Sequence, residues 1–108
     1  MESELSPQQV AQRLREDGVQ LIDVRSPEEH DAGRIAGDRH IELVELTQAA
    51  ETIDRGQTVV FYCRSGSRSA MAAEAFRGAG YEAYNMTGGL REWQAAGLPL
   101  EPEGGRVA

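Results

Sequence analysis

Apolar residues recur along the chain with two spacings, one typical of amphipathic helices and one typical of buried strands. Residues 6–18 begin with a Ser-Pro pair, which suits a helix cap and first turn, and carry Val10, Ala11 and Leu14 at helical spacing. Residues 19–24 (VQLIDV) form a short apolar run. The amino-terminal part of the chain therefore predicts a helix followed by a strand.

The next stretch carries weaker signals. Ser26 and Glu29 have the spacing of a capping box, which predicts a sharp turn into a short helix directly after the strand. A brief strand is predicted over residues 39–42. A short helix is predicted over residues 43–51, where apolar residues share one face.

Residues 58–62 (TVVFY) are β-branched and aromatic, so they predict a strand buried on both faces. This strand is the best candidate for the centre of the sheet. A loop over 63–68 leads into SAMAAEAFRGAG, an alanine-rich stretch whose apolar residues recur at helical spacing. A last strand is predicted over 81–85 and a last helix from Gly88 to near Gly97.

This alternation of helices and strands predicts an α/β domain with a largely parallel sheet. The length of 108 residues fits a single domain, which we place at residues 1–100. Residues 101–108 contain proline and glycines and have no apolar periodicity. We therefore expect them to form a flexible tail.

Composition excludes several kinds of chemistry. The chain has no lysine, which rules out Schiff-base catalysis, pyridoxal phosphate anchoring and a lysine-containing phosphate loop. A single cysteine cannot form an internal disulfide, and one cysteine with two histidines falls short of the usual zinc set. We expect no metal and no cofactor.

The formal net charge of −7 argues against binding to nucleic acid, which needs a basic face. No stretch approaches the roughly 18 apolar residues of a membrane span, and the amino terminus lacks the pattern of a secretion signal. We therefore expect a soluble cytoplasmic protein that binds neither nucleic acid nor membrane.

The segment with the clearest chemistry lies between the most strand-like stretch and a strongly helical one: Cys63, Arg64, Ser65, Gly66, Ser67 and Arg68. The carboxyl end of a parallel strand is where open α/β sheets place their ligands, and a helix amino end favours negative charge. Both effects favour the thiolate of Cys63.

The other loop residues fit the same interpretation. Arg64 and Arg68 add positive charge if they approach the sulfur. The small residues Ser65, Gly66 and Ser67 permit a tight turn whose N–H groups converge on an anion bonded to Cys63.

The alternative is that Cys63 is simply a small buried apolar residue, as most isolated cysteines are. A core cysteine has no need of flanking guanidinium groups. The arginines and the glycine therefore favour the reactive interpretation.

Three motifs in this order resemble those of rhodanese-domain sulfurtransferases: LIDVRSPEEHDAGRIAG at 21–37, CRSGSR at 63–68 and GGLREW at 88–93. The resemblance covers about residues 5 to 100. It implies a parallel sheet of about five strands with helices on both faces.

The resemblance also implies an activity. Cys63 would accept a sulfane sulfur from thiosulfate or a persulfide donor and pass it to cyanide or a thiol acceptor, with residues 64–68 holding the persulfide. A protein-to-protein persulfide carrier with little small-molecule turnover would use the same loop. A phosphatase or arsenate reductase is a third interpretation, but loops of that kind have one more residue between cysteine and arginine.

Other residues enter through the resemblance alone. Asp23 resembles an aspartate that supports the catalytic loop, although it could merely accept N–H bonds in its own turn. Arg25 and Glu29 match a pair expected to form a structural ion bridge. Gly88, Gly89 and Trp93 are interpreted as turn and packing residues.

The sequence departs from the family pattern Gly-His-Ile-Pro-Gly-Ala at Gly33 to Asp38. Arg34, Arg39 and His40 gather in a region that borders the active-site mouth in relatives, so they could form a cationic rim that attracts anionic donors. The alternative is that they are solvated charges. No motif places either histidine beside Cys63.

Overall fold

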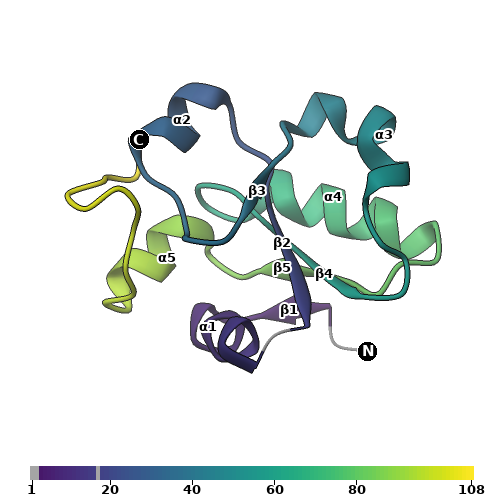
Figure 1. The fold of residues 1–108 in the computed structure, drawn as a ribbon, viewed down its shortest axis with the longest axis horizontal. Coiled ribbons are helices and arrows are strands. Elements are labelled where there is room, and N and C mark those ends of the chain that lie inside the picture. Colours follow the sequence, from purple (N-terminus) through teal and green to yellow (C-terminus); the bar gives the residue numbers. More distant parts are fainter. Residues whose placement is uncertain (1–2, 17) are drawn as a thin grey trace.

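Five strands form one parallel sheet in the order β1-β5-β4-β2-β3 (Figure 1). The computed structural model describes residues 3–16 and 18–108. The strands are β1 (Glu4–Leu5), β2 (Val19–Asp23), β3 (Arg39–His40), β4 (Thr58–Tyr62) and β5 (Ala83–Met86). The α/β class and the central place of β4 are confirmed.

Helices cover both faces of this sheet, as predicted. They are α1 (Pro7–Glu16), α2 (Pro27–Ala32), α3 (Leu46–Ala49), α4 (Ser67–Gly78) and α5 (Gly89–Ala95). Two short 3₁₀ turns, η1 (Leu43–Glu45) and η2 (Ala50–Thr52), flank α3. Within the described ranges, no helix combines the length and the apolar character that crossing a membrane requires.

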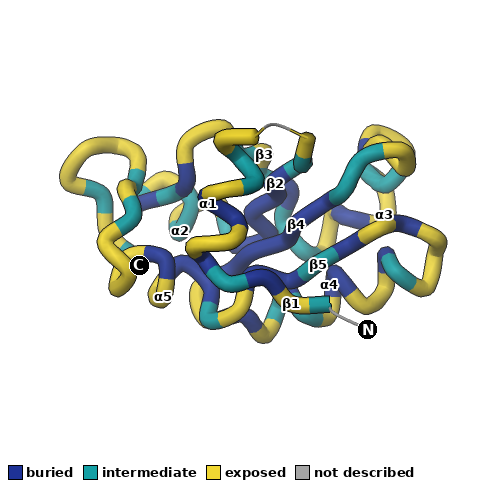
Figure 2. The backbone as a smooth tube through the Cα atoms, turned by 90° about the horizontal axis from the view of Figure 1, so that it is seen from below, coloured by how far each residue is buried: buried dark blue, intermediate teal, exposed yellow. Residues whose placement is uncertain are grey.

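The alternation of side chains along β4 divides the core into two layers, because successive residues of a strand point to opposite faces. Phe61 and Cys63 pack on the face that α3 and α4 cover. Val60 and Tyr62 pack on the face that α1 and α5 cover. In Figure 2 the strands are the buried centre of the molecule, and exposed backbone surrounds them. Cys63 therefore faces α4.

The structure differs from the predicted elements in several places. β1 was not predicted, because a two-residue strand is too short to show any periodicity. The single helix expected over 43–51 is divided into η1, α3 and η2. The last strand is Ala83–Met86 instead of 81–85, and the strand predicted over 39–42 covers only Arg39–His40. Met1, Glu2 and Asp17, which the predicted domain includes, lie outside the described residues.

The segment 101–108, for which the sequence predicts a flexible tail, makes backbone hydrogen bonds to the domain. Arg34 N–H donates to Glu101 O and Glu101 N–H donates to Arg34 O, both at 2.8 Å. Arg106 N–H donates to Ala32 O at 2.8 Å. These hydrogen bonds hold the end of the chain alongside α2 and the residues that follow it (Figure 1).

The start of α5 is attached directly to the segment that follows β4. Leu90 N–H donates to Cys63 O at 2.8 Å, and Arg91 N–H donates to Arg64 O at 3.1 Å. The approach is close because Gly89 has φ +64° and no side chain. A Cβ there would lie 2.6 Å from Cys63 O and from Arg64 O. The glycine therefore allows α5 to support the loop.

Replacing this glycine tests that contact. Gly89→Ala should lower the free energy of unfolding by about 3 kcal/mol, because it adds a collision with backbone atoms to the strain of a left-handed conformation. Gly97→Ala is the matched control, because Gly97 has φ +80° with open space around its Cβ position. It should cost about 1 kcal/mol. Urea unfolding of both variants measures the difference, and equal costs would contradict the proposed contact.

Candidate active site

The candidate site is built at the junction of β4 and α4. Cys63 comes directly after β4, and α4 begins at Ser67. Gly66 caps the helix in the left-handed region with φ +105°. This conformation turns the Gly66 N–H back toward the sulfur, to which it donates at 3.1 Å. The predicted strand–loop–helix arrangement is present.

Several hydrogen-bond donors converge on the sulfur. Besides Gly66, the backbone N–H of Ser69 donates to Cys63 Sγ at 3.5 Å and the Ser69 hydroxyl at 3.3 Å. Burial alone would raise the pKa of the Cys63 thiol, but bonds from the Ser69 side chain and from the backbone of Ser69, Gly66 and Ser65 outweigh it. The pKa of Cys63 therefore lies below its ordinary value, because donors stabilise the thiolate.

Both sequence interpretations of Cys63 describe part of its environment. The residue is completely buried and packs with Phe61 and Phe76 in the apolar layer under α4. Its sulfur is nevertheless hydrogen-bonded on the loop side. Because Cys63 has no exposed surface, a molecule the size of thiosulfate can reach the sulfur only if the groups around Cys63 move.

Sequence reasoning missed Ser69, which hydrogen-bonds the sulfur, and two residues linked to it in turn, Asn85 and Glu4. Ser69 is fully buried, and its hydroxyl contacts both Cys63 Sγ and Asn85 Oδ1. Asn85 Nδ2 in turn donates to Glu4 Oε1 at 2.9 Å. Ser69 begins the stretch that predicts α4, but it is not one of the apolar residues that carry the helical spacing. The sequence offered one signal for these contacts, namely Asn85 within a predicted strand, because a buried polar side chain needs hydrogen-bond partners.

The two loop arginines do not contact the sulfur. Arg68 forms two hydrogen bonds with the Glu29 carboxylate, at 2.8 and 2.9 Å. Its pKa lies above the ordinary value, mainly because of Glu29, and the negative charge of Cys63 contributes. Arg64 is exposed and donates through Nε to Ala108 O at 3.1 Å. Ser65 and Ser67 have exposed side chains in the same loop.

Asp23 lies at the end of β2, next to β4 in the sheet, and it holds Arg25. The guanidinium donates to both Asp23 oxygens, at 2.8 and 2.7 Å, and both side chains are fully buried. Asp23 also accepts the Arg25 backbone N–H at 3.0 Å. This last bond agrees with the interpretation of Asp23 as an acceptor in its own turn.

The expected ion bridge between Arg25 and Glu29 is wrong. Arg25 pairs with Asp23, and Glu29 pairs with Arg68. The spacing in the sequence could not reveal these partners, because the second pair joins α2 to α4 across the fold. Through it, the capping box at Ser26 and Glu29 also positions the end of the loop at residues 63–68.

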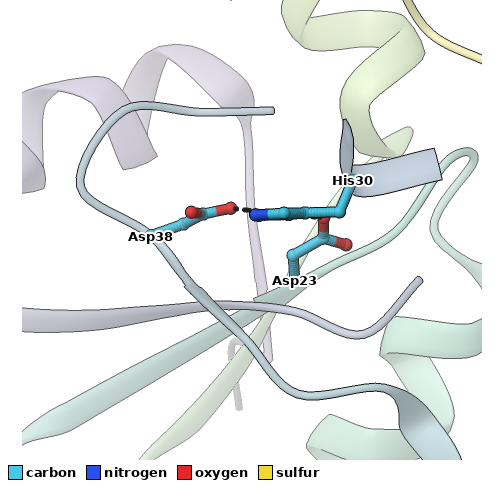
Figure 3. Close-up of side chains that lie close together, drawn as sticks. All are labelled: Asp23, His30 and Asp38. Carbon is cyan, nitrogen blue, oxygen red and sulfur yellow. Dashed lines mark hydrogen bonds and ion pairs between the residues drawn. The ribbon is translucent and has the colours of Figure 1, made fainter. Parts of the chain in front are cut away.

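Asp23, His30 and Asp38 form a cluster whose nearest atoms lie within 4.8 Å of one another (Figure 3). His30 Nδ1 lies 2.8 Å from Asp23 Oδ2 and 3.7 Å from Asp38 Oδ2. Burial raises the pKa of Asp38, although the Tyr62 hydroxyl donates to it at 2.6 Å. Because Arg25 and Tyr62 already occupy these carboxylates, we assign the cluster to internal ion pairing rather than to a metal site.

The three residues expected at the mouth bond to other parts of the fold. Arg34 Nη1 donates to His30 O at 3.3 Å, and Arg39 donates to Thr52 O at 3.1 Å. His40 Nε2 lies 2.7 Å from Arg25 O, and its ring stacks on His30 with centroids 4.4 Å apart. Across the part of the chain that the structure describes, none of the three contacts Cys63.

Comparison with known proteins agrees with the fold and the motifs. A model of the rhodanese-like domain family matches residues 6–96. The chain is 34% identical over 104 residues to the thiosulfate sulfurtransferase GlpE of Pseudomonas aeruginosa, covering 95% of this chain and 93% of that protein. It is 43% identical over 76 residues to the uncharacterized protein YqhL of Bacillus subtilis, covering 69% of this chain and 60% of YqhL.

A solved structure shows the same architecture. The crystal structure of a rhodanese-related protein from Thermoplasma volcanium matches with a TM-score of 0.86 and 26% sequence identity, covering 93% of this chain and 98% of that one. The chain therefore belongs to the rhodanese-like domain family, as the three motifs predicted.

The ion pair between Arg68 and Glu29 should appear in the acid stability of the protein. The Arg68 hydrogen bonds, opposed by burial, lower the pKa of Glu29 from 4.5 to about 2. A carboxyl group whose pKa is lower in the folded state stabilises the protein at pH values above its unfolded pKa. This stabilisation is lost as the pH falls toward the folded pKa. Glu29→Gln keeps the cap but should lose about 1 kcal/mol at neutral pH, since the pair is partly exposed.

Urea unfolding of both proteins across a pH series measures this difference. It should shrink as the pH falls from about 4.5 toward 2, where wild-type Glu29 becomes protonated. Glu28→Gln, an exposed position on the same helix, should show no such convergence. A difference for Glu29→Gln that is constant over this range would contradict the ion-pair assignment.

Proposed function

We propose that the protein is a sulfurtransferase that carries a sulfane sulfur on Cys63. The observation that carries this proposal is the convergence of the Gly66 N–H, the Ser69 N–H and the Ser69 hydroxyl on the sulfur of the chain's single cysteine. Such donors stabilise a thiolate, and they also suit a negatively charged persulfide. A relative of almost the same length, GlpE, is named a thiosulfate sulfurtransferase.

In the first step, the Cys63 thiolate attacks the outer sulfur of thiosulfate. A new S–S bond forms at Cys63, the S–S bond of thiosulfate breaks, and sulfite leaves with the electron pair. In the second step, cyanide or an acceptor thiolate attacks the terminal sulfur. The S–S bond at Cys63 breaks and the thiolate is regenerated, so no outside oxidant or reductant is consumed.

The remaining loop residues have supporting roles in this proposal. The backbone N–H groups of residues 64–68 line the place where the terminal sulfur would lie. Arg64 and Arg68 supply positive charge for an anionic donor, and Arg34 and Arg39 add positive charge farther out, in the same stretch of the chain as His40. We also give a supporting role to Asp23, which pairs with Arg25 at the end of the neighbouring strand. No cofactor takes part in either step.

The test is a mass measurement. Incubation with thiosulfate should add the mass of one sulfur atom to the wild-type protein, and cyanide should then remove it. Cys63→Ser and Cys63→Ala should gain nothing, because each lacks the attacking sulfur. Sulfate, which has no sulfane sulfur, is the control reagent. A sulfur adduct on either variant, or none on the wild type, would sink the proposal.

A protein-to-protein persulfide carrier is the second candidate, and two observations favour it. Cys63 is fully covered in the resting structure, so access to it depends on movement. Val44 and Met71 are large apolar residues that are 82% and 60% exposed. They lie on η1 and α4, which pack against each other, and α4 starts in the catalytic loop. We propose that a partner protein would dock on these two exposed apolar side chains.

The two candidates differ in which donor loads Cys63 faster. For the carrier, Val44→Asp and Met71→Asp should lower the ratio of loading by a protein persulfide to loading by thiosulfate by about tenfold, because burying such a side chain is worth about 1.5 kcal/mol or more. Gln8→Asp, on the exposed side of α1, adds the same charge elsewhere as a control. An unchanged ratio in all three variants favours the small-molecule enzyme.

A further inference from the structure

The hydroxyl of Ser69 lies between two hydrogen-bond acceptors but has only one hydrogen to donate. Its oxygen is 3.3 Å from Cys63 Sγ and also within hydrogen-bond distance of Asn85 Oδ1. All three residues are at least nine-tenths buried, so water cannot easily replace a lost partner. The two acceptors therefore compete for the same hydrogen.

The orientation of the Asn85 amide makes this competition one-sided. Asn85 Nδ2 donates to the carboxylate of Glu4 at 2.9 Å, and Glu4 lies directly opposite Asn85 in the register of β1 and β5. The Thr87 hydroxyl donates to the same Glu4 oxygen at 2.9 Å. Because a carboxylate accepts and cannot donate, it keeps Nδ2 toward Glu4 and leaves the acceptor Oδ1 toward Ser69.

We propose that Asn85, oriented by Glu4, is a positioning residue that holds the Ser69 hydroxyl hydrogen while Cys63 is uncharged and gives it up when Cys63 ionises. As a neutral thiol, Cys63 can donate its own hydrogen to the Ser69 oxygen, and the Ser69 hydrogen stays on Asn85. As a thiolate, Cys63 needs that hydrogen, and Oδ1 loses its buried partner. Asn85 therefore opposes ionisation and limits how acidic Cys63 becomes.

The Ser69 hydrogen can point to Cys63 or to Asn85, and these two positions match the free thiolate and the persulfide of Cys63. This part of the inference rests on the proposed function. A free thiolate carries its charge on Sγ, beside Ser69. In a persulfide the charge moves to the terminal sulfur, and Sγ becomes an uncharged atom between two bonds. The Ser69 hydrogen is then free to return to Asn85, which favours the loaded state over the empty thiolate.

Substitutions at Asn85 and Ser69 do not change the other charged groups near the sulfur. They come from the loop, α4, α2, β2 and β1, and they are Arg64, Arg68, Glu29, Asp23 and Glu4. Arg68 and Glu29 neutralise each other, and Asp23 is paired with Arg25. Substitutions at Asn85 and Ser69 leave all of these charges in place, so the effect of the hydroxyl hydrogen can be measured separately.

A double-mutant cycle on the acidity of Cys63 tests the proposal. The chain has one cysteine, so the ultraviolet absorbance of the thiolate reports its titration without interference from another thiol. Ser69→Ala should raise the Cys63 pKa by removing a donor. Asn85→Leu should lower the pKa by about half a unit to one unit more when Ser69 is present than in the Ser69→Ala background. Ser69→Thr, which keeps a hydroxyl, should restore the dependence on Asn85.

An equal shift from Asn85→Leu in both backgrounds would overturn the proposal, because it would show that Asn85 acts without the Ser69 hydroxyl. A shift toward higher pKa that requires Ser69 would also overturn it. The cycle cancels the general effect of placing an apolar side chain near the sulfur, because that effect is common to both backgrounds.

Two substitutions at the exposed residue Glu4 provide a second test if Asn85→Leu fails to fold. Glu4→Gln removes the charge but keeps an oxygen that accepts from Asn85, whereas Glu4→Ala also frees the amide to rotate. The Cys63 pKa should be lower in Glu4→Ala than in Glu4→Gln, and equal values would contradict the proposal. These titrations need no sulfur donor, so they can succeed even if the thiosulfate experiment fails.

Discussion

The hydrogen bonds to the sulfur of Cys63 are the constraint that the neighbouring elements satisfy. A buried sulfur can be ionised only if donors replace the water it has lost, and here the donors are backbone and hydroxyl groups at the amino end of α4. For these groups to point inward, β4 has to end at Tyr62 and Gly66 has to adopt a left-handed conformation. α5 then supports the loop from beneath through hydrogen bonds to Cys63 O and Arg64 O.

Charge around the site is balanced in two pairs, one local and one that connects separate elements. Asp23 and Arg25 are both fully buried, and each neutralises the other. A buried charge requires such a partner. Glu29 joins α2 to the end of the loop at residues 63–68 through Arg68. Both loop arginines therefore bond to other parts of the protein, Arg68 to Glu29 and Arg64 to Ala108 O.

The sequence predicted the fold class, the central strand and the position of the loop, because each depends on neighbouring residues. The run of apolar residues at 58–62 and the cap at Ser26 and Glu29 are local signals, and both elements occur where expected. The strand β1 was missed because two residues carry no pattern. That strand supplies Glu4, so the hydrogen-bonded chain from Glu4 through Asn85 to Ser69 could not be foreseen either.

The partners of charged and polar side chains show where local information ends. Residue types and spacing were enough to select Cys63 and to place it between a strand and a helix, because the chemistry of a thiol and the propensities of its neighbours are properties of a short segment. Glu29 bonds Arg68 instead of Arg25, and Asn85 meets Ser69, because packing brings distant segments together. Such pairs form between whichever groups share a buried space, and that space exists only once the sheet and helices have assembled.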